Sequence, residues 1–217
     1  MTVLQTLTGA LATAPVDFTK EKSLPYLNTV VEVSRPKVKL QIKGLKSKYI
    51  YNLGILEDYK PPFAYVSFYL IDKDSLFNHN VILTVALAEG YIQGARKISA
   101  ISLSSKIKDI RQEGLGYPIY QYLVKAYKKI EGDLYQSDPA RKIWVKLSRD
   151  GNVSICSRTT KKIVQKNIKL LNDLDGQIWY SEDNDLIYEK TREREIAINH
   201  FLICTKINKP DQRLKFI

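Results

Sequence analysis

The sequence predicts an α+β fold in which a mixed, mostly antiparallel sheet is flanked by helices. Several apolar, strand-like runs follow one another, a glycine-bearing turn then leads into an amphipathic helix, and the later part alternates between helical and strand patterns. With 217 residues, of which 44% are hydrophobic, the chain can bury one globular core, or one core that carries an extension. No apolar run approaches the roughly 20 residues that span a bilayer, so no membrane segment is expected.

The first part of the chain, residues 1–60, is predicted to be a strand-containing extension packed on the core. Its clearest pattern is the alternation from Val30 to Gly44, which predicts a strand or a hairpin. A break follows at Tyr59 to Pro62, where two prolines adjoin. The boundary between extension and core is therefore placed at about residue 60.

Three consecutive antiparallel strands are predicted at the start of the core, residues 61–158. Phe63 to Ile71 is rich in aromatic and β-branched residues, as expected of a buried strand. Val81 to Ala88 is predicted to be the second strand and Tyr91 to Leu103 the third, with a tight turn at Glu89-Gly90.

The segment Arg111 to Gly116, RQEGLG, is the most informative motif of the chain. It lies between the third strand and an amphipathic helix predicted from Tyr117 to Ile130. The first N–H groups of a helix lack intrahelical partners, and the helix dipole favours negative charge at that end. Gly114 and Gly116 let the backbone come close to a phosphate, and Arg111 adds a positive charge. The sequence therefore predicts an anion cradle at this turn.

The rest of the chain is predicted to complete the fold with helices and strands. Ser137 to Pro139 indicates the start of a second helix, because an oxygen-bearing cap precedes a proline. Asn152 to Ser157 is predicted to be a strand. In the last part, residues 159–217, a third helix is expected from Thr160 to Leu174, whereas Glu195 to Lys206 fits either a strand or a helix.

The charge of the chain is strongly positive and unevenly distributed. The formal net charge is +11, and residues 104–169 contain 15 Lys and Arg against 6 Asp and Glu. This excess favours a polyanionic ligand or an acidic macromolecular partner. Two cysteines, Cys156 and Cys204, lie far apart in apolar runs, which predicts free, buried thiols and a cytoplasmic protein.

The order of these motifs resembles the GNAT superfamily of acyl-CoA-dependent N-acyltransferases over about Phe63 to Ser157. The family signature, [R/Q]-x-x-G-x-[G/A] after the fourth strand and at the start of the third helix, is matched by RQEGLG. A second family element, a fifth strand followed by Asn-x-x-Ala and a helix, is matched by Asp133 to Leu147, with Ser137 and Ala140 at the two motif positions. The combination is similar to small GNAT-like proteins encoded by bacteriophages.

The resemblance implies transfer of an acetyl or other acyl group from coenzyme A to an amine. It implies that the loop amides hold the coenzyme A pyrophosphate and that the preceding strand end pairs with the pantetheine arm. The implied cofactor-binding residues are Leu103, Ser104, Ser105, Arg111, Gln112, Glu113, Gly114, Leu115, Gly116 and Ser137. The family often places a proton-donating tyrosine four residues after the motif alanine. This chain has Trp144 there, and Tyr117 is the predicted proton donor instead. The carboxylates considered as general base are Asp109, Glu113 and Glu89.

Two other functions remain open from the sequence. Because Trp144 cannot give up a proton at useful pH, the chain could be a GNAT-like binding protein without catalysis. The basic segment also contains interleaved tyrosines, which could stack on the bases of a nucleic acid while the lysines contact phosphates. The acceptor of the acyl group is expected to be an acidic macromolecule, either a protein or a nucleic acid.

Overall fold

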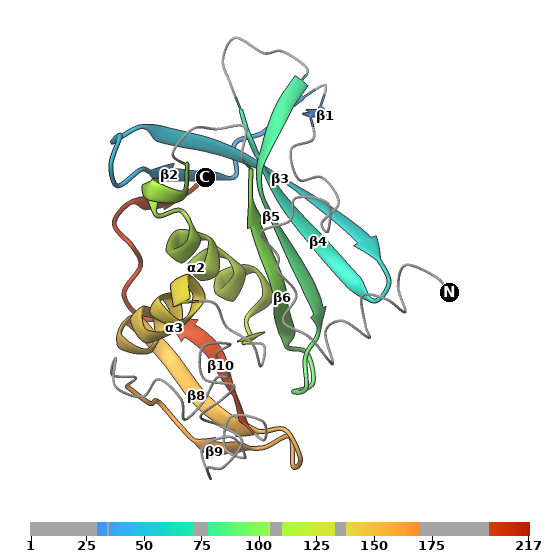
Figure 1. Cartoon of the computed structure of the whole chain (residues 1–217), viewed down its shortest axis with the longest axis vertical. Helices are drawn as coiled ribbons and strands as arrows, with labels where there is room; N and C mark the ends of the chain where they lie inside the picture. The colour runs from blue at the N-terminus through green and yellow to red at the C-terminus, as the bar shows by residue number, and fades with distance from the viewer. Residues whose placement is uncertain (1–29, 34, 72–77, 105–109, 133–137, 170–199) are drawn as a thin grey trace, which may run out of the picture.

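The fold is α+β, with a large, mostly antiparallel, open sheet and two α-helices in the residues that the structure describes. The structure is a computed structural model that describes residues 30–33, 35–71, 78–104, 110–132, 138–169 and 200–217. Figure 1 shows the sheet as a long curved layer with α2 and α3 lying against it.

The strands are short at both ends of the described chain and long in the middle. They are β1 (Val30–Glu32), β2 (Leu40–Lys43), β3 (Ile50–Lys60), β4 (Phe63–Leu70), β5 (Asn78–Glu89), β6 (Arg96–Leu103), β7 (Ile130–Glu131), β8 (Gly151–Ser157), β9 (Ile163–Gln165), β10 (His200–Ile207) and β11 (Leu214–Phe216). The helices are the 3₁₀-helix η1 (Ile110–Glu113) and the α-helices α2 (Gly116–Tyr127) and α3 (Asp138–Asp150).

The strand order is β11-β2-β3-β4-β5-β6-β7-β10-β8-β9, and β1 pairs with β5 off this path. Every pair in this order is antiparallel except β6 and β7, which run parallel because α2 connects them. The strands β2 and β3, from the predicted extension, therefore belong to the same sheet as the predicted core. The last described residues contribute strands at two separate places in the sheet. β10 lies between β7 and β8, and β11 pairs with β2.

Apolar side chains cover both faces of the central strands, which explains why FAYVSFYL in β4 is a nearly continuous apolar run. Val66 and Phe68 lie in the main core with α2 and α3, whereas Phe63 and Tyr65 lie in a second cluster with Ala86. This alternation follows the two-residue period of a strand.

The two α-helices bury their apolar stripes in the main core. From α2 the core receives Ile119, Tyr120 and Leu123, and from α3 it receives Trp144 and Leu147. Each of these five side chains is at most 2% exposed. The three central strands, α2, α3 and β8 thus confirm the predicted elements, and His200–Ile207 resolves the undecided segment as a strand.

The prediction of a helix from Thr160 is wrong for the residues that the structure describes. Ile163–Gln165 forms β9, which pairs with β8. Lys161 and Asn167 have φ of 54° and 50°, which a right-handed helix does not allow. The strand β3 was absent from the prediction. The remainder of the predicted helix, from residue 170, lies outside the described residues.

Candidate functional site

Among the described residues, the parallel strands β6 and β7 pair at the first two positions of β6. The paired positions are Arg96 with Ile130 and Lys97 with Glu131. On its other side β7 pairs with β10, and Gly132 continues this pairing because its N–H donates to Leu202 O at 2.9 Å. The described pairing of β6 with β7 therefore lies at the start of β6, and the glycine loop follows the opposite end of that strand.

The predicted anion cradle lies where β6 ends. Leu103 is the last residue of β6 and pairs with Leu83, and Ser104 N donates to Ile82 O at 2.8 Å. The loop then passes through η1 to Gly114, and α2 begins at Gly116. This confirms the predicted order of strand, glycine turn and helix.

The β2–β3 turn lies against the glycine loop. A Cβ on Gly114, which has φ of 63°, would lie 2.4 Å from Leu45 Cδ1. Glu113 is buried, and its carboxylate accepts from Ser47 N at 3.1 Å and from Ser47 Oγ at 2.9 Å. Glu113 therefore clamps this turn, a role that occupies the carboxylate considered as a general base.

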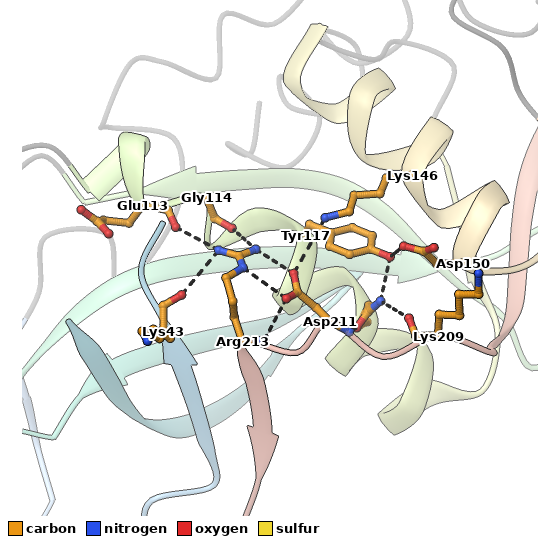
Figure 2. A network of polar contacts seen from close by, with 10 residues as sticks. Lys43, Glu113, Gly114, Tyr117, Lys146, Asp150, Lys209, Asp211 and Arg213 are labelled. Carbon is orange, nitrogen blue, oxygen red and sulfur yellow. Dashed lines mark hydrogen bonds and ion pairs between the residues drawn. The ribbon is translucent and has the colours of Figure 1, made fainter. Parts of the chain in front are cut away.

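Arg213, the residue before β11, donates hydrogen bonds to the same loop. Its guanidinium donates to Glu113 O at 3.3 Å and to Gly114 O at 3.3 Å, as Figure 2 shows. It also donates to Asp211 Oδ2 at 2.7 Å. Burial alone would raise the pKa of Asp211, but the hydrogen bonds and charge of Arg213 outweigh it and the pKa is lowered. Arg213 thus binds the carbonyl oxygens of the loop and holds the loop to the C-terminal segment.

Tyr117, the predicted proton donor, lies in a buried polar network at the start of α2 (Figure 2). Its hydroxyl donates to Asp150 Oδ2 at 2.5 Å and accepts from Gln121 Nε2 at 2.7 Å. Burial, followed by the hydrogen bond to Asp150, raises the pKa of Tyr117 far above its usual value. Gln121 links the network to the C-terminal segment, because its Oε1 accepts from Asp211 N at 2.7 Å. These contacts favour a structural role for Tyr117, and its proton transfer stays a prediction.

A second buried carboxylate, Glu131, clamps the turn at the other end of β6. Its side chain accepts from Tyr91 N at 2.7 Å and from Ile92 N at 2.8 Å. Burial raises the pKa of Glu131, and these two N–H groups and the charges of Lys97 and Arg158 only partly offset the effect. Nothing in the local sequence predicts this clamp, because about 40 residues separate Glu131 from the turn.

Trp144 occupies the α3 position where the family often has tyrosine. It is 0% exposed, and its ring packs edge-on against Tyr120 at 6.1 Å between centroids. It also lies on Gly132, where an added Cβ would be 3.3 Å from Nε1. Its Nε1 has no hydrogen-bond partner. Trp144 is thus a core residue, as its apolar helix face predicted, with one unsatisfied polar atom beside Gly132.

The other predicted loop residues differ in exposure. Arg111 and Gln112 are exposed, and Lys46 Nζ donates to Gln112 Oε1, whereas Leu115 is buried. Ser105 and Ser137 lie outside the described residues, as does Asp109. Glu89 is exposed at the end of β5, opposite Arg96 and distant from the glycine loop along β6.

The positive charge gathers in the second half of the chain. The described residues 110–132, 138–169 and 200–217 contain 17 Lys and Arg against 5 Asp and Glu. The four carboxylates among them whose side chains are described all have internal partners: Glu113, Glu131, Asp150 and Asp211. Exposed cations recur on α3 at Lys142, Lys146 and Arg149, a spacing that places them along one stripe. The surface of this half is therefore strongly cationic.

The predicted tyrosine stacking surface is not formed on α2. Tyr117 and Tyr120 are buried, and Tyr122 and Tyr127 are partly buried against the core. Base stacking needs open ring faces, so these side chains do not supply a platform for a single strand.

Both cysteines are buried free thiols, as the sequence predicted. Burial raises the pKa of Cys156 to about 11 and that of Cys204 to about 12, which works against a thiolate nucleophile.

In the part of the chain that the structure describes, no three His, Cys, Asp or Glu side chains are grouped to hold a metal ion. In the same part, no helix has the length and hydropathy to cross a membrane. No family model, curated protein or solved structure matches the chain.

Proposed function

We propose that this protein is an acyl-CoA-dependent N-acyltransferase of the GNAT type. The single observation that carries the proposal is the glycine loop that follows β6 and opens α2, after which β7 runs parallel to β6. Backbone groups at the end of a strand can pair with an extended ligand, and a helix start favours a phosphate. Coenzyme A has both parts, because its amide-bearing pantetheine arm ends in a pyrophosphate.

The strand order also supports this function. Three antiparallel strands lead into the loop, α2 returns the chain to a parallel strand, and α3 follows it. This order matches the fourth strand, third helix, fifth strand and next helix that accompany RQEGLG in the family. The two helices that the family places earlier have no counterpart between β3 and β4, which are joined directly by Pro61 and Pro62.

In the proposed reaction a neutral amine of the acceptor attacks the thioester carbonyl. A tetrahedral oxyanion forms, the C–S bond breaks, the amine nitrogen loses a proton and the coenzyme A thiolate gains one. We propose an acidic macromolecule as the acceptor, because the second half of the chain presents lysines and arginines while its described carboxylates are used internally.

Calorimetric titration with acetyl-CoA tests the ligand. We expect saturable binding, and we expect Gly114→Val to abolish it because a branched side chain at φ of 63° displaces the loop. Gly94→Val is the matched control, since Gly94 has φ of 73° but lies in the turn at the opposite end of β6. The absence of binding to the wild-type protein at millimolar acetyl-CoA would overturn the proposal.

Turnover separates an enzyme from a binding protein. A thiol reagent should report coenzyme A release only when an amine acceptor is present. Release should be faster with an acidic, lysine-containing peptide than with a neutral one, and the difference should shrink as salt is raised. Binding without release would favour the catalytically inactive alternative.

A further inference from the structure

The strands β11, β2 and β3, at one end of the strand order (Figure 1), turn one face toward the core and the other face outward. Leu40 and Ile42 of β2 and Leu53 of β3 are buried in the main core with α2. Side chains alternate along a strand and directly paired residues share a face, so the register fixes the members of the opposite face. We call this set the outer face, and it consists of Lys39, Gln41, Lys43, Ile50, Asn52 and Lys215.

The outer face is cationic and open to solvent. Its three lysines are exposed, and Ile50 is 52% exposed. Gln41 and Asn52 bind each other between the lysines, since Gln41 Nε2 donates to Asn52 Oδ1 at 2.7 Å. Residues 35–56 contain six Lys and Arg and no Asp or Glu. The face therefore attracts anions, and it disfavours a second copy of itself because like charges would meet.

The turn between β2 and β3 adds apolar side chains at the border of this face. Leu45 and Tyr49 are 50% and 51% exposed, and both lie beside exposed lysines, Lys46 and Lys48. The turn is held from within the protein, because its backbone and its serine hydroxyl donate to the buried carboxylate of Glu113. Its apolar side chains are thus presented by an ordered turn, which lowers the entropy cost of placing them in a partner.

A surface that combines lysines with half-exposed aliphatic side chains fits an anionic lipid bilayer. The charged headgroups attract the lysines, while apolar side chains enter the boundary between headgroups and acyl chains, where tyrosine is also favoured. A nucleic acid would use the lysines but would leave Leu45 and Ile50 without an apolar partner. The aromatic residue of the turn, Tyr49, already packs edge-on against Tyr51, with 4.9 Å between ring centroids, and so is a poor platform for stacked bases.

We propose that the outer face and the β2–β3 turn bind the surface of a membrane that contains anionic phospholipids. The lysines contact the headgroups, and Leu45, Tyr49 and Ile50 enter the interface. Such a contact needs no membrane-spanning helix. Because Leu45 N donates to Glu113 O at 3.1 Å, the glycine loop lies against this turn, and the contact places that loop close to the bilayer.

Sedimentation of the full chain with lipid vesicles measures the contact. We expect saturable binding to vesicles of phosphatidylcholine and phosphatidylserine mixed about seven to three, weaker binding as salt is raised, and little binding to phosphatidylcholine alone. A triple variant that carries Lys39→Gln, Lys43→Gln and Lys215→Gln should bind about a hundredfold more weakly, since each lysine near such a surface contributes about fivefold. Absence of binding to the anionic vesicles would overturn the inference.

The matched control removes three exposed lysines at the other end of the strand order. Lys161→Gln, Lys162→Gln and Lys166→Gln give a chain of the same net charge, and these lysines flank β9, whose Ile163 is 44% exposed. The control should lose less than about threefold in affinity, because its lysines lie away from the outer face. An equal loss in the two triple variants would contradict the inference, since net charge alone would then explain the binding.

Entry of the turn into the interface is tested with a polarity-sensitive thiol dye. Ile50→Cys provides an exposed thiol, whereas Cys156 and Cys204 are buried and should resist labelling. The emission should shift to the blue on addition of anionic vesicles, and a dye attached through Ile163→Cys should not respond. Unshifted emission at the first position, or equal shifts at both, would show that the turn does not enter the bilayer.

A nucleic acid is the competing occupant, and the lysine variant of the outer face distinguishes it. If that variant lost binding to a single-stranded oligonucleotide while its vesicle binding stayed unchanged, the face would belong to a nucleic acid and the inference would fail. None of these measurements uses coenzyme A. Their failure therefore leaves the proposed function untouched, and failure of coenzyme A binding leaves this inference untouched.

Discussion

Glu113 and Glu131 each hold a turn by hydrogen bonds at opposite ends of β6, but the two turns differ in their exposure to solvent. Each is a buried carboxylate that accepts hydrogen bonds from a distant turn: Glu113 from Ser47, and Glu131 from Tyr91 and Ile92. Both carboxylates are buried, but Ser47 is exposed to solvent whereas Tyr91 and Ile92 are partly buried. The comparison shows that one type of contact can differ in energetic importance, because water can replace one clamp and not the other.

The largest difference should follow removal of each carboxylate. We expect Glu131→Ala to lower the free energy of unfolding by about 3–5 kcal/mol, because it leaves two partly buried N–H groups and the nearby cations uncompensated. Glu113→Ala should cost only about 1–2 kcal/mol, because water can reach Ser47. Urea denaturation measures both values. Equal losses of unfolding free energy in the two variants would show that solvent exposure does not decide how much each clamp contributes to stability.

A smaller effect should appear in the pH dependence. The pKa of Glu131 is raised from its ordinary value of 4.5, so the folded state binds its proton more tightly than the unfolded state does. The resulting stability is fully present below pH 4.5 and is lost as the pH rises through the raised pKa. The wild-type protein should therefore lose stability relative to Glu131→Gln across this range, as measured by denaturation at several pH values. A constant difference between the two profiles would contradict the raised pKa.

The smallest effects are expected at the glycines beside the clamped turns. Gly94→Ala should cost about 1–2 kcal/mol from its φ of 73° alone, since nothing lies within 4 Å of an added Cβ. Gly114→Ala should cost slightly more, because Leu45 must also move, although this side chain is 50% exposed and free to shift. Thermal denaturation can rank the two variants. A neutral Gly94→Ala would show that its turn relaxes to a negative φ.

Much of the fold could be predicted because local patterns and packing agree. In α2 and β4 the apolar residues recur at the period of the element and lie in the core. The failure after Thr160 has a local cause. Ile163 and Val164 fit the apolar spacing of a helix, but their side chains are 44% and 61% exposed. These β-branched residues lie instead in β9, which pairs with β8.

The candidate site could be predicted only in part, because the residues that contact the glycine loop lie far from it in the sequence. RQEGLG is a local motif, and its position after a strand and before a helix is confirmed. The residues that hold it are remote, since Ser47 lies 66 positions from Glu113 and Arg213 lies 99 from Gly114. A single sequence contains no signal that joins such residues, so Glu113 was considered as a base rather than as a clamp.

The position of β10 between β7 and β8 has a consequence for how the protein is made. Neither β7 nor β8 has its central neighbour until His200–Ile207 has left the ribosome, and β2 lacks its outer neighbour until Leu214–Phe216 has followed. The β3–β6 meander can form earlier, because its neighbours are adjacent in sequence. We therefore expect the meander of the nascent chain to form early, while β7 and β8 stay unpaired with β10 until late in synthesis. During that interval their strand edges are exposed to aggregation or to chaperones.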